Sequence, residues 1–162
     1  GGMRRRLLLA RGIVHEPRRV LLDEPTVGLA PQIRTELWTL IGDLKARGTT
    51  ILMSTHYLEE AERLADEVAV MTKGKIISRG RPAELIAQHA GCETAEIYAP
   101  PDRLAEARLE AEAAGLRVRP AGPAIAIVGS EGANDGVIPD DAVRRAASLE
   151  DVFVLLTGEE AE

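Results

Sequence analysis

The first 91 residues alternate between short apolar runs and longer segments in which apolar residues recur every three or four positions. Val20–Leu22 is wholly apolar, the pattern of a strand buried on both faces of a parallel sheet, and Thr50–Ser54 is a second apolar strand. Between them, the segment from Pro31 to Gly48 predicts a helix, because proline suits the first helical turn and glycine suits the end. Its apolar stripe consists of Ile33, Leu37, Leu40, Ile41 and Leu44. Strands that alternate with helices indicate an α/β fold with parallel pairing and right-handed crossovers.

The same periodicities predict further elements on either side of this core. The helices are residues 4–15, Leu58–Ala65 and Pro82–His89, and the strands are Val68–Met71 and Lys75–Ser78, joined by a turn at Lys73-Gly74.

The pattern changes from Cys92 onward. The predicted elements are a strand over Glu93–Tyr98, a helix over Arg103–Ala114, a strand over Ala124–Val128 and a loop over Gly129–Asp141. Ser148 and Asp151 have the spacing of a capping box, with Asp in place of the usual Glu, and predict a last helix. This half is expected to form a small α+β appendage without a catalytic motif.

The charge of the chain divides at the same place. Residues 1–91 carry 14 Lys/Arg and 11 Asp/Glu, a balance of +3, whereas residues 92–162 carry 6 and 15, a balance of −9. We therefore predict two domains with these bounds. An acidic half repels phosphates, so the balance argues against a nucleic-acid partner.

Composition narrows the class of protein further. Apolar residues make up 45% and charged residues 28%, which is typical of a globular chain, and aromatic residues are only 2%, so the core must be aliphatic. Cys92 is the single cysteine and cannot form an internal disulfide, which favours a reducing compartment. No apolar run approaches the roughly 18 residues of a membrane span, so a role at a membrane requires another chain.

The candidate chemistry lies where the two apolar strands end. The first runs into Asp23 and Glu24, and the second into His56. Because parallel strands end at one edge of a sheet, where α/β proteins bind ligands, we expect the three side chains to lie together. Asp23 suits Mg²⁺ bound through water, and Glu24 suits a base acting on a nucleophile. The alternative is a plain strand end with solvated acids and a structural histidine. The arrival of all three at one edge favours the functional interpretation.

Taken as a set, these segments resemble the ATP-binding subunits of ABC transporters, and in particular the drug-resistance and nodulation-factor exporter branch. The similar segments are Gly1-Gly2-Met3-Arg4-Arg5-Arg6 (end of the signature motif, with Met for the usual Gln), Asp23-Glu24 (Walker B), Thr26–Ala30 (D-loop), His56 (switch histidine), Tyr57–Arg63, and Asp66–Gly80 after the switch. The resemblance covers roughly residues 1–90.

The resemblance implies the C-terminal part of a P-loop NTPase domain of the ABC type, with ATP and Mg²⁺ as its ligands. Glu24 would polarise the attacking water, Asp23 would hold the metal and His56 would contact the γ-phosphate. Gly1, Gly2 and Met3 would bind the ATP of an opposite subunit, and Gly28, Leu29 and Ala30 would form the D-loop contact. The implied partners are a second ATP-binding subunit, most simply another copy, and an integral membrane permease, which places the protein peripherally on the cytoplasmic face of the cell membrane.

Two departures from the family pattern matter. No Gly-x-x-x-x-Gly-Lys-Ser/Thr occurs in the chain, so we expect a partial subunit that alone neither binds ATP tightly nor hydrolyses it. The D-loop ends in Leu29-Ala30, where the family usually has Leu-Asp, which predicts weakened coupling between the two nucleotide sites.

Two other interpretations stay open. The first is an ABC ATPase of DNA repair or translation, although such relatives usually carry coiled coils or basic extensions that this sequence lacks. The second is a non-catalytic module that binds a partner through its acidic half.

Overall fold

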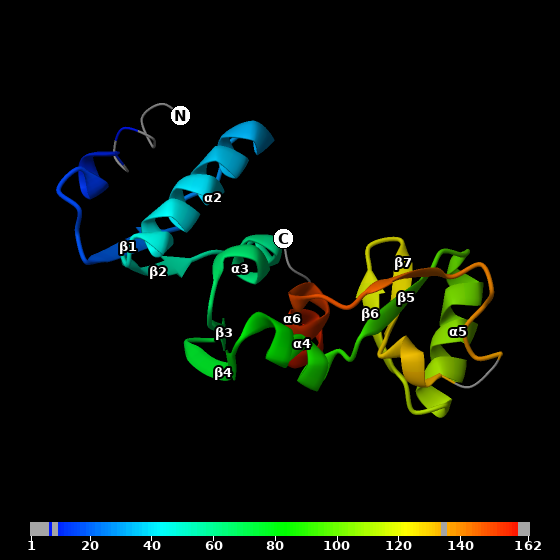
Figure 1. The fold of residues 1–162 in the computed structure, drawn as a ribbon. Helices are drawn as coiled ribbons and strands as arrows, with labels where there is room; N and C mark the ends of the chain where they lie inside the picture. Colours follow the sequence, from blue (N-terminus) through cyan, green and yellow to red (C-terminus); the bar gives the residue numbers. More distant parts are fainter. Residues whose placement is uncertain (1–6, 8–9, 134–135, 159–162) are drawn as a thin grey trace. The chain divides into compact units, whose positions relative to one another are not determined.

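The computed structural model describes residues 7, 10–133 and 136–158, and it divides the chain into two compact units, Gly1–Leu64 and Ala65–Glu162 (Figure 1). The predicted boundary between residues 91 and 92, which follows from the change in pattern and charge, stays a prediction. Among the residues described, no helix combines the length and the apolar character needed to cross a membrane.

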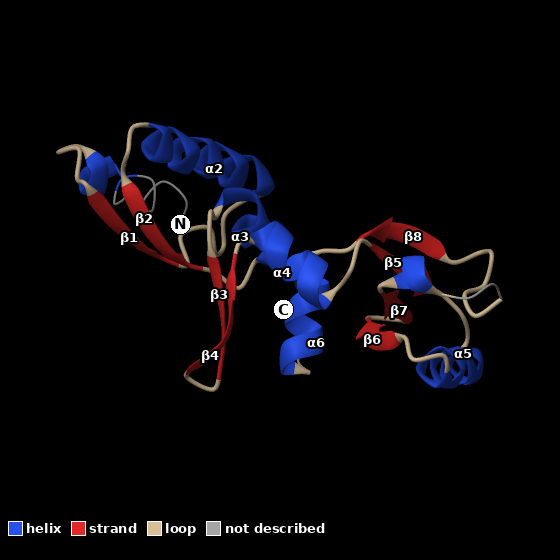
Figure 2. Ribbon diagram, turned by 60° about the horizontal axis from the view of Figure 1, so that its bottom comes forward, coloured by secondary structure: helices blue, strands red, loops and turns tan. Residues whose placement is uncertain are grey.

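The first unit is built on two parallel strands. β1 (Arg19–Asp23) and β2 (Thr50–Ser54) pair so that Asp23 lies opposite Ser54. α2 (Pro31–Ala46) connects the strands and lies alongside them (Figure 2), and α3 (Leu58–Leu64) follows β2. The predicted order and parallel pairing are confirmed, and a helical segment precedes β1 over residues 10–13. Part of the helix predicted over residues 4–15 lies outside the described residues.

The ends of α2 follow from its sequence. Pro31 occupies the first turn, and Ala30 is the N-cap, with extended backbone and no capping hydrogen bond from its side chain. At the other end, Gly48 has φ +89°, and its N–H donates to the Lys45 carbonyl at 2.8 Å. The helix buries Trp38, Ile41 and Leu44. The other members of the predicted stripe, Ile33, Leu37 and Leu40, are half-buried, so the stripe is confirmed but missed the tryptophan.

The prediction that the first strand is buried on both faces is wrong for this structure. Leu21 is 77% exposed and its partner Leu52 is 69% exposed, whereas the alternate side chains of both strands are half-buried. No described element of this unit covers the face that carries Leu21 and Leu52. An apolar run therefore predicted the strand correctly but not the layers around it.

The second unit begins with an antiparallel hairpin. β3 (Val68–Thr72) pairs with β4 (Lys75–Gly80), with an irregularity between Val70 and Met71. The hairpin agrees with the predicted strands and turn. α4 (Pro82–His89) follows and packs against the last helix of the chain, α6 (Leu149–Thr157).

A four-stranded antiparallel sheet forms the rest of this unit. Its order is β6-β7-β5-β8, from β5 (Glu93–Ile97), β6 (Arg117–Ala121), β7 (Ala124–Val128) and β8 (Val143–Ala146). α5 (Pro101–Ala113) packs on the sheet beside an aliphatic core that includes Ala95, Ile97, Ala111, Ile125 and Ile127 (Figure 2). Ser130–Gly132 forms a short 3₁₀ turn. The α+β class predicted for this half is confirmed, but β6 and β8 were not predicted.

Asp151, at the start of α6, is the centre of a buried ion cluster. Its carboxylate accepts from Arg119 Nε at 2.8 Å and from both Arg145 terminal nitrogens at 2.8 and 2.9 Å. Burial alone would raise the pKa of Asp151, but the hydrogen bonds from Arg145, Arg119 and the Ser148 N–H outweigh it and lower that pKa to about 2. The predicted capping box between Ser148 and Asp151 is confirmed. The neighbouring Arg144 instead pairs with a partly exposed carboxylate, that of Glu93.

Candidate active site

The carboxyl ends of β1 and β2 bring the predicted residues together. Ser54 Oγ donates to Asp23 Oδ1 at 2.5 Å and accepts from the Glu24 backbone N–H at 3.1 Å. The same N–H lies 3.2 Å from the Ser54 carbonyl oxygen. These bonds extend the pairing of the two strands one residue beyond β1, so the positions of both acids are fixed by the sheet.

Glu24 has an unusual backbone conformation. Its φ is +44°, in the left-handed region that non-glycine residues rarely adopt, and Pro25 follows it. Such a conformation costs about 1–3 kcal/mol and persists only where surrounding contacts impose it. Here the Glu24 N–H donates to both Ser54 Oγ and the Ser54 carbonyl oxygen, which holds this conformation, and the chain turns sharply at the edge of the sheet.

The Glu24 carboxylate meets the imidazole of His56 at this edge. Glu24 Oε2 lies 2.9 Å from His56 Nδ1, and the two side chains are 35% and 41% exposed. The His56 ring also packs against Tyr57, with 4.3 Å between ring centroids, and the Arg34 guanidinium lies 4.4 Å from the Tyr57 ring centre. The imidazole is thus oriented from two sides, and because Nδ1 faces Glu24, Nε2 is the atom available to a ligand.

The oxygen donors at this edge suit Mg²⁺. Besides the Ser54 bond to Asp23 and the His56 bond to Glu24, each carboxylate has a second oxygen. Across the described part of the chain, no group of three or more His, Cys, Asp and Glu side chains could hold a metal by itself. This sparse set fits Mg²⁺, which keeps several waters and binds through one or two carboxylates together with substrate phosphates. The role of Asp23 in metal binding stays a prediction.

The segment predicted to be the D-loop forms a tight turn after Glu24. Thr26 is fully buried, and its carbonyl accepts from the Leu29 N–H at 3.1 Å. Gly28 has φ +72°, a conformation that favours glycine. The Leu29 side chain is buried and Ala30 is exposed at the start of α2, so a ligand contact by Leu29 has to use its backbone. The predicted nucleotide contacts of Gly28, Leu29 and Ala30 stay predictions.

The signature residues Gly1, Gly2 and Met3 lie outside the described residues. Their expected contact with the nucleotide of an opposite subunit stays a prediction from the sequence.

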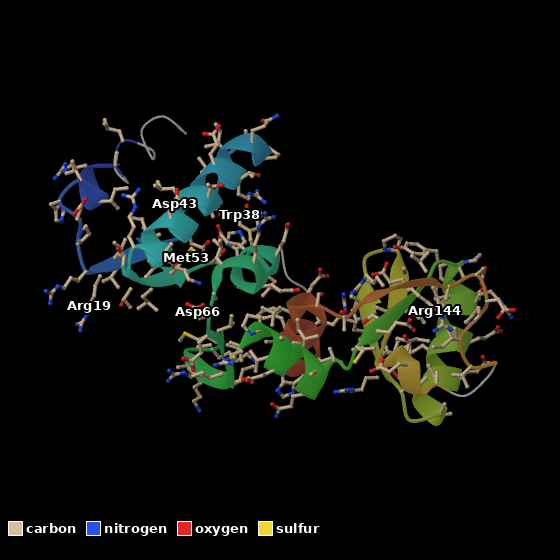
Figure 3. All side chains as sticks on the ribbon, viewed as in Figure 1. Arg19, Trp38, Asp43, Met53, Asp66 and Arg144 are labelled. Carbon is tan, nitrogen blue, oxygen red and sulfur yellow. The ribbon has the colours of Figure 1, made fainter. Side chains whose placement is uncertain are left out.

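Glu60 is a residue of this region that the sequence analysis did not single out. Its carboxylate is fully buried and accepts three hydrogen bonds. Oε1 accepts from Trp38 Nε1 at 2.8 Å, while Oε2 accepts from Thr55 Oγ1 at 2.6 Å and Thr26 Oγ1 at 3.2 Å. Trp38 lies on α2 next to α3 (Figure 3). A glutamate on a short helix usually faces solvent, and the available signal was a tryptophan whose indole N–H needs a buried acceptor.

Comparison with solved structures identifies the class of protein. A structure of the ATP-binding subunit of an ABC transporter is 31% identical to this chain, covers 54% of this chain and 36% of its own, and superimposes with a TM-score of 0.50. No family model matches the sequence.

Curated relatives narrow that class. The Nod factor export ATP-binding protein I of Ralstonia nicotianae is 41% identical over 171 residues, covering 99% of this chain and 53% of that protein. The protein of the same name from Burkholderia orbicola is also 41% identical, over 165 residues, covering 100% of this chain and 54% of that protein. The chain therefore belongs to the ABC transporter ATP-binding proteins, as its motifs indicated. It spans about half the length of the curated relatives it matches.

Proposed function

We propose that this chain supplies the water-activating and switch residues of an ABC exporter ATPase, which drives transport through a separate integral membrane subunit. The observation that carries the proposal is the 2.9 Å contact between Glu24 Oε2 and His56 Nδ1 beside Asp23, at the carboxyl edge of a parallel strand pair. The names of the relatives, which are export ATP-binding proteins, support export over DNA repair or translation.

Glu24 is placed to act as a general base. One of its oxygens contacts His56, and the other can accept a proton from the water that attacks the γ-phosphate. The left-handed backbone held by the bonds to Ser54 keeps the carboxylate at the edge where that water would lie.

His56 acts on the transferred phosphate through Nε2. A carboxylate accepts from Nδ1–H, so Nε2 donates to a phosphate oxygen only when the ring carries both protons. The doubly protonated ring also places a positive charge near the phosphate, where negative charge is spread in the transition state.

Asp23 holds the metal through water in this proposal. Bound together with the nucleotide, Mg²⁺ would neutralise charge on the phosphates. The Ser54 hydroxyl fixes one oxygen of Asp23, and the other, on an exposed residue, would accept a water ligand.

The assembly follows from the same assignment. Gly1, Gly2 and Met3 and the turn Gly28–Ala30 act on the nucleotide of an opposite ATP-binding subunit, most simply a second copy of the protein. The dimer is bound to its permease at the cytoplasmic face of the membrane. The 162-residue chain alone neither binds ATP tightly nor hydrolyses it, because its sequence holds no phosphate-loop motif.

Replacing the proposed base tests this function in the whole ATP-binding subunit to which this segment corresponds. Glu24→Gln keeps the shape of the side chain but removes the base, so ATP binding should persist while turnover falls about 10²-fold or more. Asp43→Asn is the matched control, because Asp43 is an exposed acid on α2 (Figure 3). Wild-type turnover in Glu24→Gln, measured with the permease present, would remove Glu24 from this role.

A further inference from the structure

The buried carboxylate of Glu60 connects the two segments that carry the candidate catalytic side chains. Thr26 lies two residues after Glu24, and Thr55 immediately precedes His56. Both hydroxyls donate to the same oxygen, Glu60 Oε2, at 3.2 and 2.6 Å. The chain positions on either side of the candidate site are therefore joined through one atom.

The environment of Glu60 makes this connection restrictive. The side chain is fully buried, and its described partners are two hydroxyls and the Trp38 indole N–H, all of them neutral donors. A buried carboxylate that loses a donor cannot replace it with water, so each of these bonds is costly to break. Thr55 is held further, because its Oγ1 also accepts from the Tyr57 N–H at 3.0 Å. Neither segment can move without leaving the carboxylate under-bonded.

The contact between Glu24 and His56 needs such support. Both side chains are about one-third or more exposed, and an exposed ion pair or hydrogen bond contributes little to holding its own geometry. Catalysis nevertheless requires the reacting groups to be held closely, since a misplacement of about 1 Å costs on the order of 100-fold in rate. The rigidity must come from buried contacts behind the site, and Glu60 provides them for both segments.

We propose that Glu60 is a positioning residue that sets the distance between Glu24 and His56 by binding Thr26, Thr55 and Trp38. Its catalytic consequence rests on the proposed ATPase function, whereas the hydrogen-bonded cluster itself does not. The substitution Glu60→Gln cannot satisfy all three donors. If its amide nitrogen faces Trp38, the indole N–H loses its acceptor, and if it faces the threonines, both hydroxyls lose theirs.

The cluster can be observed directly through Trp38, which is the single tryptophan of the chain. Its indole N–H gives one resonance in a ¹⁵N–¹H spectrum of the 162-residue chain. Glu60→Met removes both carboxylate oxygens and leaves only a weak sulfur acceptor, so the resonance should move upfield and its hydrogen exchange should accelerate. Glu59→Gln, an exposed acid next in sequence, should leave the resonance in place. An unchanged resonance in a folded Glu60→Met variant overturns the proposal.

The positioning role is tested in the whole ATP-binding subunit with its permease. Glu60→Gln should lower kcat between about 10-fold and 100-fold per folded molecule, with KM for ATP within about twofold, because geometry rather than ground-state binding is lost. Glu59→Gln should leave both constants unchanged. A wild-type kcat in folded Glu60→Gln overturns the positioning role even where the Trp38 resonance has moved.

If the Glu60 variants fail to fold, a milder pair of variants at Thr55 tests the positioning role. Thr55→Val removes one hydroxyl and should lower kcat in the same way, and Thr55→Ser restores the hydroxyl and should restore kcat. A purely structural role predicts that Thr55→Val melts at a lower temperature than Thr55→Ser but has the same rate per folded molecule, and that result contradicts the proposal. The Glu24→Gln variant is measured in parallel. Normal turnover there refutes the ATPase assignment, while the Trp38 resonance still reports on the cluster.

Discussion

Placing an aspartate at position 30 should stabilise the first unit. Ala30 is the N-cap of α2, with φ −62° and ψ 150°, and it offers no side-chain acceptor. Its carbonyl already accepts from the Arg34 N–H at 3.0 Å, and Pro31 has no N–H, so the first-turn donors in need of an acceptor are those of Gln32 and Ile33. An Asp side chain at the N-cap accepts from such donors, and α2 has no acidic residue in its first turn.

The size of the effect follows from these two terms. An N-cap acceptor contributes about 1 kcal/mol relative to alanine, and a negative charge at a helix N-terminus adds about 0.3–1 kcal/mol. For a unit of this size, each kcal/mol raises the melting temperature by about 4–8 °C. The expected shift for Ala30→Asp is therefore an increase of roughly 5 to 16 °C, measured by circular dichroism.

Two control variants separate the causes. Ala30→Asn supplies the acceptor without the charge and should retain most of the gain at any ionic strength. Ala46→Asp places the same charge in the last turn of α2, where it opposes the helix dipole and should lower the melting temperature. An Ala30→Asp variant that melts at or below the parent temperature would refute the N-cap geometry. Ala30→Asp and Ala30→Asn together also test the weakened coupling between the two nucleotide sites that the sequence predicts, because only Asp restores the family's charge at this position.

Three further outcomes are expected. Asp151 has a folded-state pKa of about 2, below its ordinary 3.8, so its contribution of on the order of 2 kcal/mol is complete above about pH 4 and is lost as the pH falls towards 2. Urea unfolding between pH 2 and 5 measures this loss, and Asp151→Asn should reduce the slope of stability against pH. His56→Ala should depress turnover with little change in melting temperature, because the side chain is 41% exposed; a large fall in melting temperature with normal activity per folded molecule would contradict the assignment. Truncation after His89 removes α6, which packs on α4, and uncovers Leu85, which is 2% exposed. The truncated chain should therefore self-associate in analytical ultracentrifugation. A stable monomer would show that α6 is not needed to cover α4.

Much of the fold could be predicted because its central elements carry their own periodicity. α2 and β7 match their predicted ranges closely, since an apolar stripe and an apolar run are local signals. β6 and β8 have no such signal and lie at the two edges of their sheet. β6 contains Pro120, which an edge strand tolerates, and β8 is charged, with two consecutive arginines. Their strand structure comes from pairing with β7 and β5, not from propensity.

The candidate site shows a similar division. Asp23, Glu24 and His56 could be placed at one edge because strand ends in a parallel pair are adjacent. The contacts of Ser54 with Asp23 and of Glu60 with Thr26 could not be predicted, since the partners lie 31 and 34 residues apart in sequence. For Glu60 in particular, residue type and helical position both indicate an exposed side chain, and only the packing of α3 against α2 buries it.

The consecutive arginines of β8 also affect the register in which this strand pairs with the sheet. Neighbouring strand residues face opposite sides, and here Arg144 reaches Glu93 while Arg145 reaches Glu96 and Asp151. Sliding β8 by a single residue along β5 would exchange the two sides, and the buried aspartate would lose the guanidinium that contacts both of its oxygens. An edge strand of four residues has little else to determine its register against β5. The charge pattern therefore destabilises the slipped register relative to the native one and disfavours misfolding of this unit.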